Sequence, residues 1–179
     1  MKRVTIGLAA VAFALVAAGP ANAHVFTIHG DWKIGSFEIK RDGTLGGAVE
    51  AFGRPDSRKR HGVSCTVRWE RHALKMVFYN LGGENPCRKE SGLFSNARAA
   101  GPHWKTNRGL EIGDSQRRLR SLYPNARFRS GLESVLPARC WLVTRRSQLG
   151  TGGRYPGLLA KLLGERVSQF QVRYPAGGD

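Results

Sequence analysis

Apolar and polar positions first follow a helical period, over residues 45–52. There, apolar residues recur at the three- and four-residue spacing of one helix face: Leu45, Ala48, Val49 and Phe52. Thr44 can cap the first turn, and Gly53, followed closely by a proline, can end the last one. The pattern therefore predicts a short helix over residues 44–52.

The pattern then changes to a two-residue period, which is typical of strands. The runs Cys65–Trp69 and Leu74–Tyr79 alternate apolar and polar residues, and we interpret them as a hairpin. A short extended segment is expected before the first helix, near Ile34–Ile39. Leu81–Asn107 is rich in Gly, Asn, Pro and Ser, and it predicts a long connection with at most one edge strand.

The same order of elements follows in the second half of the chain. Asp114 or Ser115 can cap a second helix, which Pro124 ends. The apolar stripe of this helix consists of Leu119, Leu122 and Tyr123. A helix followed by antiparallel strands thus occurs twice.

The C-terminal strands are predicted at Cys140–Thr144, at Leu158–Leu163 and at Arg166–Val172, with a glycine-rich loop over residues 150–153. Gly164-Glu165 is a two-residue turn, and glycine at its first central position favours type II′. Together these patterns predict the α+β class, with short helices packed on an antiparallel sheet. Residues 39–79 and 110–172 are candidates for a duplicated helix-plus-strands unit.

One part of the chain resembles a known family. Gly109–Ser115, the helix that ends at Leu122–Pro124 and the strands that meet at Leu163–Val167 resemble the unit of beta-lactamase-inhibitor-like domains. They are also similar to the small barrel-assembly lipoproteins of outer membranes, and the whole chain resembles secreted proteins of actinobacterial type. In both domain families a helix packs on an antiparallel sheet, and the inhibitor family carries the unit twice. The lipoprotein cysteine is missing here, and no functional residue of either family can be carried over.

The first 23 residues have the organisation of a secretory signal peptide. A basic start, Met1–Arg3, precedes an apolar stretch, and the small residues Ala21 and Ala23 fit a peptidase cleavage site. The apolar stretch is shorter than the roughly 20 residues of a membrane-spanning helix. We expect cleavage near Ala23, a single α+β domain over residues 24–179, and a secreted or cell-wall-associated protein.

The three cysteines lie beyond this segment, where an oxidising environment favours disulfides. Cys65 begins a predicted strand and Cys87 lies in the loop beyond the next one, so we predict a Cys65–Cys87 disulfide. Closing this loop would stabilise the fold by roughly 3 kcal/mol. Cys140 is left over and is expected to be a small buried apolar residue beside Trp141. No CxxC or HxxxH motif occurs, so we expect no metal and no cofactor.

The chain is strongly basic, with a formal net charge of +16 that becomes +14 when Lys2 and Arg3 leave with the signal peptide. Such a charge attracts anionic polymers. The candidate anion-binding residues are Arg58, Lys59, Arg60, Arg117, Arg118 and Arg120. Further basic pairs occur at Arg127 with Arg129 and at Arg145-Arg146. Trp69, Trp104 and Trp141 lie in strand-like segments and are expected in the core, which disfavours specific nucleic-acid recognition by base stacking.

Motifs for catalysis are missing from the sequence. It has no GxSxG elbow, no phosphate-binding loop and no dinucleotide fingerprint. The best catalytic group is Glu70, His72 and Arg68 near the hairpin turn, which could serve a nuclease as base, acid and phosphate ligand. Our leading hypothesis is a non-catalytic secreted domain that binds a protein partner or an anionic envelope component. The alternative is a small secreted hydrolase of nuclease type.

Overall fold

The structure, a computed structural model, describes residues 25–129, 138–146 and 154–174. The predicted signal peptide over residues 1–23 and the predicted loop over residues 150–153 lie outside the described residues. Within the described part, no helix is long and apolar enough to cross a membrane.

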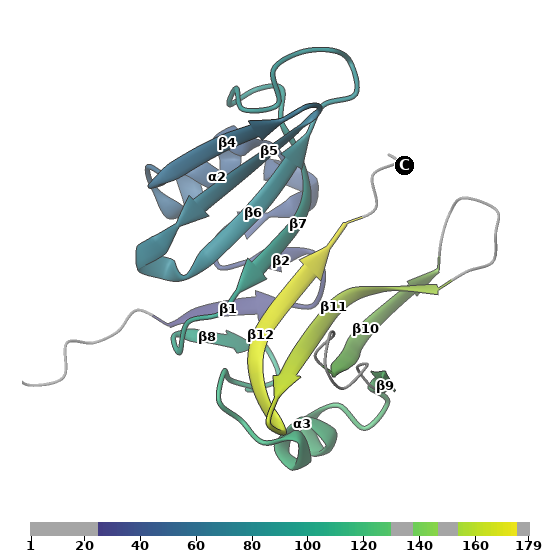
Figure 1. Ribbon diagram of the computed structural model, residues 1–179. Coiled ribbons are helices and arrows are strands. Elements are labelled where there is room, and N and C mark those ends of the chain that lie inside the picture. Colours follow the sequence, from purple (N-terminus) through teal and green to yellow (C-terminus); the bar gives the residue numbers. More distant parts are fainter. Residues whose placement is uncertain (1–24, 130–137, 147–153, 175–179) are drawn as a thin grey trace, which may run out of the picture.

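Eight antiparallel strands form one large sheet in the order β4-β5-β6-β7-β12-β11-β10-β9 (Figure 1). The strands are β4 (Ser57–His61), β5 (Ser64–Trp69), β6 (Leu74–Tyr79), β7 (Leu93–Ala99), β9 (Arg127–Arg129), β10 (Arg139–Arg146), β11 (Arg154–Leu163) and β12 (Arg166–Arg173). Two meanders, β4 to β7 and β9 to β12, meet where β7 pairs with β12. Each meander follows one of the longer helices in the chain.

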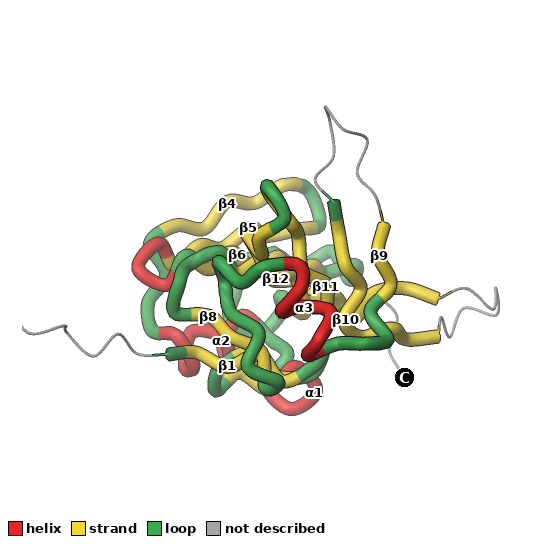
Figure 2. Tube along the Cα trace, turned by 90° about the horizontal axis from the view of Figure 1, so that it is seen from below, coloured by secondary structure: helices red, strands yellow, loops and turns green. Residues whose placement is uncertain are grey.

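A smaller sheet has the order β3-β2-β1-β8, and only its β1–β8 pair is parallel. Its strands are β1 (Phe26–His29), β2 (Lys33–Ile34), β3 (Phe37–Glu38) and β8 (Trp104–Thr106). Figure 2 shows this sheet and the helices α1 (Ile39–Asp42) and α2 (Leu45–Phe52) on the same side of the first meander. The third helix is α3 (Gln116–Leu122), and a 3₁₀ turn, η1 (Glu70–His72), joins β5 to β6.

Both longer helices begin and end where the sequence predicts. The Thr44 hydroxyl accepts a hydrogen bond from the Gly47 amide at 3.2 Å, and the Ser115 hydroxyl accepts one from the Arg118 amide at 3.2 Å. These bonds satisfy amides that have no partner inside the helix. The β5–β6 hairpin is also confirmed, with Cys65 opposite Phe78 and Trp69 opposite Leu74.

The predicted fold class is wrong. Over the described residues the molecule consists mainly of β-structure, with twelve strands in two sheets and three short α-helices. The prediction of helices packed on a sheet failed because residues 26–38 and 93–106 carry no clear two-residue period. Both nevertheless form strands, and the small sheet takes much of the place that helices were expected to fill.

The long connection predicted over Leu81–Asn107 contains β7, a central strand between β6 and β12, not an edge strand. Its alternation is hidden by a bulge, because Phe78 pairs with Phe94 while Val77 pairs with Asn96. Ser95 is therefore an extra residue, and Phe94 and Ala97 face the same side although they are three positions apart.

The turn between β11 and β12 also differs from its predicted type. Gly164 has φ 54° and Glu165 has φ 61°. Two positive φ angles are typical of type I′, whereas type II′ has only the first. The predicted type II′ turn is therefore wrong, and the non-glycine residue Glu165 adopts the left-handed conformation.

The core lies between the two sheets and under the helices. Trp69 and Trp104 are fully buried, and their indole N–H groups donate to the carbonyl oxygens of Gly53 at 2.8 Å and of His72 at 2.6 Å. The predicted Cys65–Cys87 disulfide is confirmed, with the two Cα atoms 5.2 Å apart. Cys140 is a free thiol and is buried. One face of the large sheet thus contributes most of the core.

Candidate functional site

Strand alternation turns the large sheet into two chemically different faces. On β5 the side chains of Cys65, Val67 and Trp69 are buried in the core, so Arg68 between them lies on the opposite face. Arg68 is opposite Lys75 of β6, and Lys75 is opposite Arg98 of β7. Three cations from neighbouring strands thus lie side by side across the sheet.

In the second meander the same register carries uncharged residues. Arg98 pairs with Gln171 of β12, which in turn pairs with Leu159 of β11, and Leu159 pairs with Trp141 of β10. On the same face, Lys161 of β11 is opposite Arg139 of β10, and Arg139 is opposite Arg129 of β9. The face away from the core is therefore basic from one edge of the sheet to the other.

Each of the eight strands contributes a cation to this surface, which we call the cationic face, and β9 contributes a second one, Arg127, opposite Trp141. Counted as one cation for each strand, in the order of the sheet, the eight are Lys59, Arg68, Lys75, Arg98, Arg173, Lys161, Arg139 and Arg129. Figure 1 shows this side of the sheet toward the viewer, with α2 and the small sheet behind it. Arg68, Lys75 and Arg98 lie opposite one another on strands about 4.8 Å apart, and Lys161, Arg139 and Arg129 do the same at a different register, while Arg173 lies opposite Asn96.

Opposite charges hardly compensate this face. In the described ranges, its one ion pair joins Arg68 to Glu70, with 4.0 Å between Nη1 and Oε1, and both side chains are at least half exposed. Such an exposed pair contributes little to stability. The face therefore carries a large uncompensated positive charge.

Burial and mutual repulsion act on the cations in the middle of the face. Burial lowers the pKa of Lys161, and the charges of Arg98, Arg139 and Arg173 lower it further. The pKa of Lys75 is lowered for the same two reasons, with Arg98 and Arg68 as the charged neighbours. These shifts mean that a bound anion would relieve an existing cost of holding like charges together.

The floor below these cations is largely dehydrated. Leu159 is 1% exposed and Gln171 is 4% exposed. The Arg129 guanidinium lies over the Trp141 ring, 5.1 Å from its centroid. The Nε of Arg139 is buried and has no hydrogen-bond partner. An anion that contacts the half-buried guanidinium of Arg139 meets stronger electrostatic attraction than it would at a fully hydrated lysine.

The predicted anion-binding residues divide between separate surfaces. Successive residues of a strand point to opposite faces, so Lys59 belongs to the cationic face, whereas Arg58 and Arg60 are opposite the core residues Val67 and Cys65. All three lie on the exposed edge strand β4, where charged side chains also discourage pairing with another sheet.

The second predicted group, Arg117, Arg118 and Arg120, lies on α3 and is exposed. Leu119 of this helix is buried in the core, so α3 covers the side of the sheet opposite the cationic face. The structure therefore does not bring the two predicted groups together.

The predicted catalytic residues do not converge on one cavity. Glu70 is exposed and forms its ion pair with Arg68. His72 instead packs against the rings of Phe26 and Phe52, at centroid distances of 4.8 and 6.2 Å. Its Nε2 accepts a hydrogen bond from Arg71 at 3.1 Å. The imidazole is thus engaged on the aromatic side of the turn, away from the phosphate ligand that a nuclease would need.

Sequence reasoning missed five members of the cationic face: Lys75, Arg98, Arg139, Lys161 and Arg173. The sequence does indicate which face of a strand a basic residue occupies, because apolar and polar residues alternate. Arg68 and Lys75, for example, lie on the polar positions of the predicted hairpin. Their assembly depends on strand pairings between residues far apart in the chain.

Over the described ranges, no three His, Cys, Asp or Glu side chains form a group that could hold a metal ion. Comparison with known proteins found no matching family model, no matching curated protein and no matching solved structure.

Proposed function

We propose that the protein is a secreted, non-catalytic binding domain whose cationic face binds a linear anionic polymer of the cell envelope. The observation that carries this proposal is the presence of one cation from each of eight neighbouring strands on one face of the large sheet.

The arrangement favours an extended ligand that crosses the strands. Seven intervals of about 4.8 Å give the face a width of about 34 Å. Five of the eight cations are arginines. Arginine binds phosphate and carboxylate groups with two parallel hydrogen bonds. A polymer with regularly repeated phosphate or carboxylate groups can therefore contact several strands at once.

The proposal includes export of the protein from the cytoplasm. It rests on the signal-peptide pattern of residues 1–23, and the Cys65–Cys87 disulfide is compatible with an oxidising compartment. An anionic polymer outside the cytoplasm would then be within reach of the face.

The alternative of a nuclease-type hydrolase gains no support from the geometry. Glu70 and Arg68 lie on the solvent side, and His72 packs on Phe26 and Phe52. A protein partner remains a distinct outcome, because an acidic protein surface could also meet the cationic face.

The experiment compares two variants with the same change in net charge. One replaces three cations of the face, Arg98→Gln, Arg139→Gln and Lys161→Gln. The control replaces three exposed arginines elsewhere, Arg58→Gln, Arg117→Gln and Arg118→Gln. Binding of long-chain polyphosphate is measured by calorimetry at several salt concentrations, and thermal unfolding checks that both variants fold.

We expect the face variant to lose affinity strongly and to reduce the slope of log K against log salt by about 2, because three counterion-releasing contacts are removed. The control should stay close to the wild type. Equal losses in both variants would show that only net charge matters and would overturn the proposal. If the protein does not bind polyphosphate but binds an acidic envelope protein at physiological salt, the ligand of the cationic face is a protein and not a polymer.

A further inference from the structure

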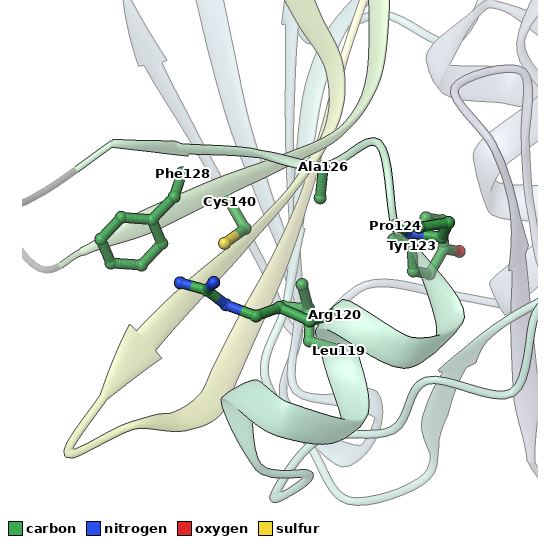
Figure 3. A pocket seen from close by; sticks show the side chains of 7 residues that line it. All are labelled: Leu119, Arg120, Tyr123, Pro124, Ala126, Phe128 and Cys140. Atoms are coloured by element: carbon green, nitrogen blue, oxygen red, sulfur yellow. The ribbon is translucent and has the colours of Figure 1, made fainter.

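A hollow of about 350 Å³ lies on the other side of the sheet from the cationic face (Figure 3). It is bounded by α3 and by the strands β9 and β10. Cys140 forms part of its wall and is opposite Ala160, whose side chain belongs to the core. The neighbouring residue Trp141 points to the cationic face instead. The hollow is therefore a separate feature of the molecule.

The lining is mostly apolar. Leu119 and Tyr123 come from α3 and its C-terminal end, Pro124 and Ala126 come from the segment that leads to β9, and Phe128 comes from β9 itself. Phe128 is 42% exposed, which is unusual for an aromatic side chain on a strand. Volumes of this size are typical of small-ligand sites.

One charged residue contributes to the lining. The Arg120 side chain extends from α3 toward Phe128 and Cys140 (Figure 3), and its guanidinium lies 5.9 Å from the centre of the Phe128 ring. In the part of the chain that the structure describes, no carboxylate lies within 4.0 Å of Arg120. Its charge is available to a ligand.

The thiol beside it is neutral and apolar in character. Burial raises the pKa of Cys140, and the nearby charge of Arg120 lowers it to a smaller extent. A neutral thiol packs like a small apolar group. The hollow thus combines an apolar wall, a neutral thiol and one cation at its edge.

We propose that this hollow binds a small amphiphile with one carboxylate group, whose anionic end pairs with Arg120 and whose aliphatic body lies against Leu119, Phe128 and Cys140. The charge of Arg120 selects an anionic head, and the apolar walls gain from covering a hydrocarbon body. The site is independent of polymer binding, because its residues lie on the opposite side of the sheet.

Octanoate is the probe, and 1-octanol is the uncharged probe with the same chain length. Binding to the full-length protein is measured by calorimetry. A second readout is the rate at which iodoacetamide alkylates Cys140 at alkaline pH, where part of this thiol is ionised. Cys140 is the only thiol left when the other two of the three cysteines form the disulfide. A ligand in the hollow must slow this reaction.

Two variants and one matched control locate the site. Arg120→Gln removes the cation, Ala126→Leu fills the hollow, and Arg117→Gln removes an exposed arginine from the same helix without touching the hollow. We expect octanoate to bind about tenfold more weakly to Arg120→Gln, because a charge-assisted contact is lost, and at wild-type strength to Arg117→Gln. Octanol should bind more weakly than octanoate, its affinity should not depend on Arg120, and Ala126→Leu should abolish binding of both.

Octanoate that neither binds nor protects Cys140 would overturn the proposal, and so would binding that Ala126→Leu leaves unchanged. The variant with three cations removed from the cationic face should retain octanoate binding. If that variant loses octanoate binding while Arg120→Gln keeps it, the ligand occupies the cationic face and the hollow is not its site.

Discussion

Lys161 illustrates what the cationic face does to a single residue. Its side chain is half-buried, and its charged neighbours Arg98, Arg139 and Arg173 come from three other strands. Burial and repulsion both disfavour the protonated amine. The folded protein therefore holds this charge less readily than the unfolded chain does.

This difference predicts a pH dependence of stability. The pKa of Lys161 in the folded state lies below its ordinary value of 10.5, so in the interval between the two values the unfolded chain binds more protons. Stability then rises with pH across this interval. We expect the wild type to gain stability relative to Lys161→Gln as pH increases from neutral toward 10.5, as measured by urea unfolding at each pH.

Lys89→Gln provides the control, because Lys89 is exposed in the connection between β6 and β7. The stability difference between this variant and the wild type should change much less with pH. A constant difference for Lys161→Gln over the same range would show that the cationic face exerts no strain on Lys161.

The residues of the face could not be identified from the sequence, because proximity on a sheet depends on register. Arg98 and Lys75 lie opposite each other, although the bulge at Ser95 and a long loop separate them in the chain. Arg58 and Lys59 are neighbours in the chain, yet they lie on opposite faces. Runs of basic residues were the visible signal, and in a strand such a run is divided between two surfaces.

At the scale of elements, the β11–β12 turn contains a residue in an unfavourable conformation. Glu165 has φ 61°. For residues other than glycine and asparagine, this left-handed conformation raises the free energy of the folded state by about 1–2 kcal/mol. Asparagine tolerates this conformation. We expect Glu165→Asn to stabilise the protein by about 0.5–1 kcal/mol in chemical unfolding.

The control for this substitution is Glu84→Asn, which removes the same charge from an exposed loop position. It separates the conformational gain from the increase in net positive charge. Equal effects of the two substitutions would mean that the turn conformation contributes nothing.

Elements with strong local signals were predicted correctly, and elements without them were not. Thr44 and Ser115 cap helices through bonds to residues three positions later, so the sequence itself contains both partners. The strand β7 has no such signal, because its bulge breaks the alternation and its partners β6 and β12 lie on either side of it in the chain. The fold class was wrong for the same reason, since strands without a local period were interpreted as connections.

At the scale of the whole molecule, the cationic face exists because the two meanders join edge to edge through β7 and β12. Either meander alone carries four of the eight cations. Joining them doubles the number of neighbouring charges on one surface. The disulfide between Cys65 and Cys87 ties β5 to the connection between β6 and β7 in the first meander.

The joined face predicts how affinity depends on ligand length. A linear polyanion that crosses all eight strands can use every cation, whereas a shorter one reaches only part of them. We therefore expect the affinity for polyphosphate oligomers to rise with length until the extended oligomer spans about 34 Å, which is seven inter-strand intervals. Beyond that length only the number of equivalent binding positions increases, so the rise should become shallow. Calorimetry with size-fractionated oligomers at fixed salt measures this curve.

The position of the break distinguishes the joined face from a general attraction to positive charge. A variant with Arg139→Gln and Lys161→Gln removes cations from the second meander and leaves the first meander intact, so its affinity should stop rising at a shorter oligomer length. Removing Arg117 and Arg118 from α3 lowers the net charge equally and should leave the break in place. If the curve instead rises without a break, or shifts equally in both variants, polymers do not lie across the strands and the cationic face is not their path.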